Sequence, residues 1–158
     1  QLAAILGVMS LPQDDTPASP VSWEQATLFA TEMQRMCSNV ILSLPSESEI
    51  EHALRVLGAK RYRPNGTLPS CSARVRKPLR GEVIGLLGGV WEWTSSTWRP
   101  YPGNRRTDRI ADSHVLRGGC TKCKAVTCTP EARLAGVAGD GVQAGFRLVL
   151  REKPKDEF

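Results

Sequence analysis

The stretch VIGLLGGVWEWTSS, residues 83–96, sets apolar and aromatic residues between glycines and predicts a strand, a turn and a second strand. Trp91 and Trp93 are two positions apart, so they face one side of a strand while Glu92 faces the other. We expect Trp91 and Trp93 to lie in the core, together with Trp98. The fold is therefore expected to be built round a sheet with these tryptophans on its inner face.

Two helices are predicted before this stretch. Residues 22–37 begin with Ser22 and carry Gln25 three positions later, and residues 46–58 repeat this pattern with Ser46 and Glu49. Both pairs fit a capping box, which satisfies the first free N–H groups of a helix. Apolar residues recur at helical spacing in both segments: Ala26, Phe29, Ala30 and Met33, then Ile50, Ala53, Leu54 and Leu57, with Gly58 at the C-terminal cap position.

Short strands and loops are predicted for much of the remaining chain. ILSLP (41–45) predicts a brief strand, HVLRGG (114–119) a strand that runs into a glycine turn, and GFRLVL (145–150) a closing strand. Helical periodicity is lost after residue 58. We therefore predict one α+β domain over residues 1–158, with two helices, short antiparallel strands and long loops.

The composition restricts the classes of protein to which the chain can belong. It has 158 residues, of which 41% are hydrophobic, and no apolar run approaches the roughly 20 residues of a membrane span. The N-terminal stretch lacks a basic region, so no signal peptide is predicted. These features are typical of a globular domain without a membrane span.

The net charge of +5 is unevenly distributed. Residues 55–80 carry eight basic residues and no acid, and a second basic group comprises Arg99, Arg105, Arg106 and Arg109. Such patches fit a nucleic acid, an acidic protein, an anionic surface or simply solvated loops. Aromatic residues do not alternate with the charges in the pattern used to stack bases, so nucleic acid is not favoured.

Three of the five cysteines fall within GGCTKCKAVTCTP, residues 118–130. An odd number of cysteines leaves at least one thiol unpaired unless two chains are linked. The cysteine count therefore does not decide between an oxidising and a reducing compartment. A zinc site is one interpretation, with Cys120, Cys123 and Cys128 joined by Cys71 or a histidine. It is weakly supported, because the chain has a single C-x-x-C pair, His52 and His114 are not spaced as ligands, and His52 is expected to be solvated.

Four segments in a fixed order carry a family resemblance: PVSWEQATLFA (20–30), LPSESEIEHALR (44–55), LLGGVWEWT (86–94), and HVLRGG followed by GFRLV (114–119 and 145–149). This set resembles the formylglycine-generating enzymes, also called sulfatase-modifying factors, over about residues 20 to 150. The resemblance implies a C-type-lectin-like fold. It also implies that Arg147, in the GFR motif, is structural.

Active members of this family oxidise a sulfatase cysteine to formylglycine, using dioxygen and a copper ion held by two cysteines. The matching positions are Cys123 and Cys128, so the resemblance implies that these would be the catalytic residues and copper ligands of an oxidase. Two thiolates are soft ligands that select Cu(I). A disulfide between Cys123 and Cys128 would be compatible with an oxidase or with a binding module.

The chain departs from the family pattern at several positions. The family pattern has serine where this chain has Cys120, an aromatic residue where it has Thr121 and histidine where it has Lys124. It has asparagine where this chain has Gly89 and Gln143. The change at Gly89 removes a side-chain oxygen that the family uses around calcium, which leaves calcium binding open. The segment between Arg55 and Val83 is also short for the family. We therefore favour a non-catalytic binding module without a cofactor over the oxidase.

The same frame resembles the variable, receptor-binding proteins of diversity-generating retroelements, whose surface between RGG and GFR is diversified. Residues 134–142, LAGVAGDGV, consist entirely of types that such diversification produces. Other residues of these types are Cys120, Thr121, Cys123, Thr127, Cys128 and Thr129. Lys122, Lys124 and Gln143 do not arise in this way and would be constant.

The predicted binding face is the surface of residues 120–144, with neighbours from residues 95–106. Aromatic and arginine side chains dominate interface energies, which makes Trp98, Arg99, Tyr101 and Arg105 the expected anchors. Further contacts are expected from Thr121, Lys122, Lys124, Thr127 and Thr129. The expected partner is a protein or a small molecule, and the sequence leaves oligomer formation open.

Overall fold

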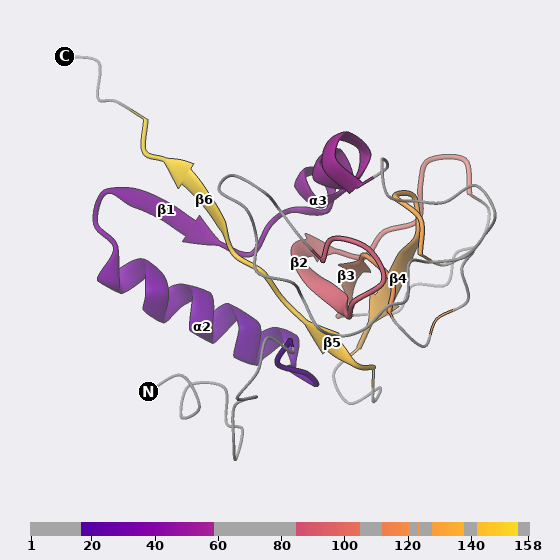
Figure 1. The fold of residues 1–158 in the computed structure, drawn as a ribbon, viewed down its shortest axis with the longest axis horizontal. Coiled ribbons are helices and arrows are strands. Elements are labelled where there is room, and N and C mark those ends of the chain that lie inside the picture. Colours follow the sequence, from indigo (N-terminus) through magenta and orange to yellow (C-terminus); the bar gives the residue numbers. More distant parts are fainter. Residues whose placement is uncertain are drawn as a thin grey trace.

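The computed structural model describes residues 17–58, 85–104, 112–120, 123, 128–137 and 142–154 (Figure 1). Its elements are α2 (Trp23–Met36), β1 (Val40–Ser43), α3 (Glu47–Ala53), the π-helical turn η1 (Leu54–Gly58), β2 (Trp91–Thr97), β3 (His114–Arg117), β4 (Arg133–Gly136), β5 (Ala144–Gly145) and β6 (Val149–Glu152). The α+β class predicted from the sequence is confirmed.

Both predicted capping boxes are present. The hydroxyl of Ser22 accepts the N–H of Gln25 at 3.2 Å, and the Gln25 side chain accepts the N–H of Ser22 at 2.8 Å. Ser46 and Glu49 make the same exchange at the start of α3. These local bonds satisfy N–H groups that have no partner within the helix, which is why each helix begins where it does.

The first and last described strands pair with each other. β1 and β6 form an antiparallel ladder from Val40 opposite Glu152 to Ser43 opposite Val149. The side-chain amide of Gln34, on α2, donates to the carbonyl of Val40 at 3.1 Å and accepts the N–H of Leu42 at 2.6 Å. Gln34 therefore satisfies polar groups along β1 and ties α2 to this small sheet. Figure 1 shows α2 lying beside β1.

The second sheet has four strands in the order β4-β3-β2-β5, and it carries the core. Trp91 and Trp93, on β2, are buried as predicted. They pack with Val21, Ala26, Leu44, Leu116 and Ala144. The indole N–H of Trp93 also donates to the carbonyl of Val21 at 2.7 Å, so the segment before α2 is fixed to the sheet.

Glu92 points away from the two tryptophans, as strand alternation predicts, yet it is also buried. Two nitrogens of Arg147 donate to its two carboxylate oxygens, each at 2.5 Å. Burial alone would lower the pKa of Arg147, but the hydrogen bonds and charge of Glu92 outweigh it and raise the pKa. This geometry agrees with the structural role that the resemblance implies for Arg147.

Three expectations are wrong in detail. Residues 85–90 contain a bend at residues 87–89 and no strand, and Gly85 and Gly88 have positive φ angles of 69° and 77° that interrupt an extended chain; residues 83 and 84 lie outside the described residues. The closing segment is interrupted between Gly145 and Val149. Trp98 is half-buried and lies outside the core clusters. Among the helices of the described residues, none is long and apolar enough to cross a membrane.

Candidate binding face and cysteine loop

The cysteine loop begins where β3 ends in two glycines. Gly118 and Gly119 have φ angles of +96° and +72°, which disfavour other residues. A Cβ on Gly118 would also come within 2.9 Å of the carbonyl oxygen of Leu86. The Gly-Gly turn predicted from the sequence is therefore confirmed, and it places Cys120 directly after the strand.

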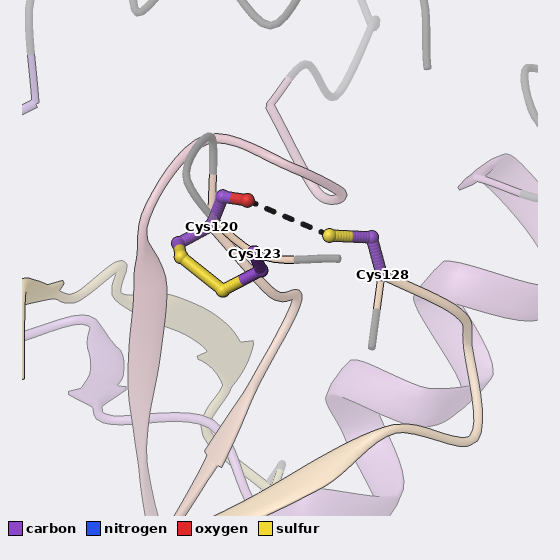
Figure 2. Close-up of a disulfide and its surroundings, with 3 residues drawn as sticks. All are labelled: Cys120, Cys123 and Cys128. Atoms are coloured by element: carbon purple, nitrogen blue, oxygen red, sulfur yellow. Dashed lines mark hydrogen bonds between the residues drawn. A yellow bond between two sulfur atoms is a disulfide. The ribbon is translucent and has the colours of Figure 1, made fainter. Parts of the chain in front are cut away.

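Cys120 and Cys123 form a disulfide, with their Cα atoms 5.1 Å apart (Figure 2). The N–H of Cys123 donates to the carbonyl of Cys120 at 3.0 Å, which closes the same short turn through the backbone. Cys128 is a free thiol, fully buried, whose Sγ is 3.5 Å from that carbonyl oxygen. The disulfide between Cys123 and Cys128 that the sequence left open is not formed, because Cys123 is bonded to Cys120.

These cysteines do not fit a two-thiolate copper site in this state. Two thiolates must be available for Cu(I), and the sulfur of Cys123 is already bonded to Cys120. Cys128 still has its thiol, but it faces a backbone carbonyl. Among the described residues no group of three or more His, Cys, Asp or Glu side chains could hold a metal, and Cys71 lies outside them.

The two histidines are separated in the structure. His52 is exposed on α3, as expected. His114 stacks on Trp23 with ring centroids 3.6 Å apart and an interplanar angle of 7°. Desolvation by burial lowers the pKa of His114, although Glu24 and Asp112 oppose this effect through their charges. His114 is thus a packing residue beside α2.

Arg117, the last residue of β3, is fully buried and reaches two carboxylates on α3. Its guanidinium is 3.2 Å from Glu47 and 3.0 Å from Glu51. It also donates to the carbonyls of Pro130 and Glu131, which follow the cysteine loop. One side chain therefore joins α3, β3 and the segment just after Cys128.

Arg133, the first residue of β4, brings the two predicted parts of the binding face together. Its guanidinium carbon lies 3.9 Å from the ring centroid of Trp98 and 4.4 Å from that of Tyr101. Its Nη1 donates to the carbonyl of Arg99 at 2.8 Å, and its Nη2 donates to Glu47 at 2.7 Å. We call these five residues, Glu47, Trp98, Arg99, Tyr101 and Arg133, the arginine–aromatic cluster.

The other predicted contact residues are only partly described. Thr129 is half-buried, and its carbonyl accepts the N–H of Ala132 at 3.1 Å. Arg105, Thr121, Lys122, Lys124 and Thr127 lie outside the described residues. Their predicted roles therefore stay predictions.

The stretch expected to be diversified is partly strand. Leu134, Ala135 and Gly136 belong to β4. A Cβ on Gly136 would come within 2.4 Å of the ring of Trp93, so this position cannot accept a range of side chains without a shift of the core. Among residues 134–142, whose types fit diversification, Gly136 is therefore a position that the packing of Trp93 restricts.

Sequence reasoning did not assign the charged partners that hold this region together. Glu47 and Glu51 lie four residues apart, so they share one face of α3. Their spacing in LPSESEIE was the available signal for a basic partner. Nothing in the sequence alone identified Arg117 and Arg133 as that partner pair.

One family model matches the chain. Residues 80–152 match the model described as sulfatase-modifying factor enzyme 1-like domain. This span contains β2 to β6, the Gly-Gly turn, the cysteine loop and most of the arginine–aromatic cluster. No curated protein matches the chain.

Proposed function

We propose that the chain, whose residues 80–152 match a sulfatase-modifying factor enzyme 1-like domain, is a non-catalytic module with a C-type-lectin-like α+β fold that binds a protein or a small molecule. The proposed binding face comprises residues 120–144 with neighbours from residues 95–106. The observation that carries the proposal is the contact of Arg133, from the first stretch, with Trp98 and Tyr101, from the second.

This cluster has the physical properties of a binding hot spot. Tyrosine, tryptophan and arginine contribute most of the energy in protein interfaces. Here Arg133 is held by Glu47 and by the carbonyl of Arg99, so the rings against it are already ordered. A preordered surface loses less conformational entropy on binding, which raises affinity without further contacts.

The cysteine loop supports a binding role over oxidase chemistry. One of the two candidate copper ligands, Cys123, is held in a disulfide with Cys120. Cys120 occupies the position at which the resemblance implies serine. The disulfide shortens the loop and fixes its start, which suits a surface that presents side chains to a partner. Diversification of the exposed loop positions is part of this proposal, with Gly136 excluded.

The test is a Cu(I) titration of two samples. One is the untreated protein, and the other is protein that was treated with a dithiol reductant, which is removed before the titration. A Cys123→Ser, Cys128→Ser double variant serves as the matched control, with folding checked by circular dichroism. For a non-catalytic module we expect no tight one-to-one Cu(I) binding by the untreated protein. We also expect no oxygen consumption with a sulfatase cysteine peptide before or after reduction.

The second candidate is the formylglycine-generating oxidase, with Cys123 and Cys128 as ligands. It is favoured by one observation: Cys128 keeps its thiol and lies in the same loop as Cys123. Tight one-to-one Cu(I) binding that is lost in the double variant, together with peptide-dependent oxygen consumption, would establish the oxidase and exclude the module.

A further inference from the structure

We propose that the arginine–aromatic cluster is a docking site for an acidic segment of a partner protein. This inference rests on the proposed function and specifies its partner class. The cluster combines one arginine whose charge is already compensated, Arg133, with another that is exposed, Arg99. The difference between these two arginines determines what the surface attracts.

Most charges around the cluster are paired within the chain. Arg133 and Arg117 share Glu47, and Arg117 also reaches Glu51. Arg55 is 2.9 Å from Glu51 and 3.5 Å from Glu131. These pairs leave little free negative charge on this side of α3 and β4.

Arg99 differs from the others because its side chain is exposed and no described carboxylate lies within ion-pair distance of it. The segment that carries Trp98, Arg99 and Tyr101 is basic in sequence, since residues 95–106 contain three arginines and no acid. The cysteine loop of residues 120–130, which precedes Glu131 and Arg133, contains two lysines and no acid. A partner with carboxylates complements this charge, and complementary charge directs both encounter and orientation.

The aromatic part of the cluster gives the partner an apolar contact beside the charge. Tyr101 is 52% exposed, although one side of its ring lies against Arg133. Pro100 and Pro102 flank it and are also exposed. Because proline fixes φ, this segment loses little backbone freedom when a partner binds. The surface thus suits a segment that alternates carboxylates with apolar side chains.

A protein segment fits better than a nucleic acid. Single-stranded nucleic acids bind by stacking bases on open aromatic faces along a positively charged groove. In this cluster a guanidinium already occupies one face of both Trp98 and Tyr101. The rings therefore offer edges and one remaining face, which an apolar side chain can use but a run of stacked bases cannot.

The test measures the affinity of a fluorescein-labelled decapeptide that contains six glutamates and two phenylalanines, by anisotropy at low and high salt. The comparison probes are the same peptide with lysine for glutamate and a single-stranded DNA decamer. The protein variants are Arg99→Glu, Tyr101→Ala and, as matched control, Lys153→Glu. Lys153 is exposed directly after β6, which lies at the opposite end of the molecule from β4 (Figure 1).

We expect the acidic peptide to bind, and both Arg99→Glu and Tyr101→Ala to weaken binding about tenfold. Lys153→Glu changes the net charge by the same amount as Arg99→Glu, so it separates local from overall attraction. Arg99→Glu keeps the backbone carbonyl that holds Arg133. We expect the control variant to bind within about twofold of the wild type.

Three results would overturn the inference: no binding of the acidic peptide, equal losses in Arg99→Glu and Lys153→Glu, or tighter binding of the DNA decamer. Its failure can be told apart from failure of the proposed function. The copper titration decides between module and oxidase, and these peptide measurements are made without copper. If the copper titration excludes the oxidase and the acidic peptide does not bind, the proposed function stands and this inference is wrong.

Discussion

The buried guanidinium of Arg117 lies 3.2 Å from the carboxylate of Glu47, a residue 70 positions earlier in the sequence. This contact joins α3 to the end of β3, from which the cysteine loop departs. Arg133 binds the other carboxylate oxygen of Glu47. A single helix residue therefore supports both the cysteine loop and the arginine–aromatic cluster.

Replacing Arg117 should destabilise the protein strongly. Arg117→Ala would remove the fully buried partner of Glu47 and Glu51, and removal of one member of a buried ion pair costs about 3 to 5 kcal/mol. Because Glu47 keeps Arg133 and Glu51 keeps Arg55, we expect a cost at the lower end of this range. Urea unfolding would measure the change in the free energy of unfolding. The control is Arg35→Ala, which removes an exposed pair with Glu32 and should cost less than about 1 kcal/mol. Equal effects of the two substitutions would contradict the buried network.

Gly136 and Gly89 should respond differently to the same substitution. A Cβ at Gly136 would meet the Trp93 ring at 2.4 Å, whereas at Gly89 its nearest neighbour is a carbonyl oxygen at 3.7 Å. Gly136→Ala is expected to destabilise by about 1 to 3 kcal/mol through overpacking, and Gly89→Ala by less than about 0.5 kcal/mol. Thermal unfolding followed by circular dichroism would measure both. If the stability of Gly136→Ala were unchanged, position 136 would accept a side chain and would be compatible with diversification.

Glu49 should make stability depend on pH in the acid range. Hydrogen bonds from Arg151, and then from Ser46, lower the pKa of Glu49 from 4.5 to about 2. Because the folded protein holds the proton less tightly than the unfolded chain, this stabilisation is complete above about pH 4.5 and is lost as pH falls towards 2. Its size should stay below about 1 kcal/mol, since the side chains of Glu49 and Arg151 are 37% and 36% exposed.

The measurement compares wild type with Glu49→Gln in urea between pH 2 and pH 6. The difference in free energy of unfolding should be largest near pH 6 and shrink towards pH 2. Glu32→Gln serves as control, because Glu32 pairs only with the exposed Arg35 among the described residues. A difference between wild type and Glu49→Gln that grows as pH falls would contradict the assigned direction.

The features predicted correctly from the sequence are those decided by neighbouring residues. The capping boxes need only residues three apart, and the burial of Trp91 and Trp93 follows from strand alternation. The Gly-Gly turn likewise depends on the glycines themselves. Each of these features could be predicted from residues that lie close together in the sequence.

The features that were missed depend on contacts between distant segments. Arg117 and Glu47 meet only when β3 packs beside α3, and no local pattern assigns one to the other. Trp98 was predicted to be in the core because of its residue type, yet it is half-buried and lies against the guanidinium of Arg133. The pairing of the cysteines was missed because three cysteines in one loop permit several disulfides. In the structure, Cys120 and Cys123 are joined both by the disulfide and by a backbone hydrogen bond.

Replacing Cys120 should change the number of reactive thiols in a way that identifies the disulfide. With Cys120 bonded to Cys123, Cys120→Ser frees Cys123, so the unfolded, unreduced protein should show one more reactive thiol than wild type. If Cys123 were instead bonded to Cys128, the same substitution would remove a free thiol and the count would fall by one. Alkylation followed by peptide mass mapping would give the count and locate the new thiol.

The same variant tests whether the disulfide keeps a soft metal from the loop. Cys120→Ser gives Cys123 and Cys128 free thiols together without a reductant, and thiolate sulfur is a ligand that Cu(I) selects. If the disulfide alone prevents binding, untreated Cys120→Ser should bind one Cu(I) that the untreated wild type does not, and Cys37→Ser, as control, should behave like wild type. Failure of Cys120→Ser to bind would mean that the buried setting of Cys128, and not the disulfide, excludes the metal. That result would strengthen the assignment of the cysteines as structural residues of the loop.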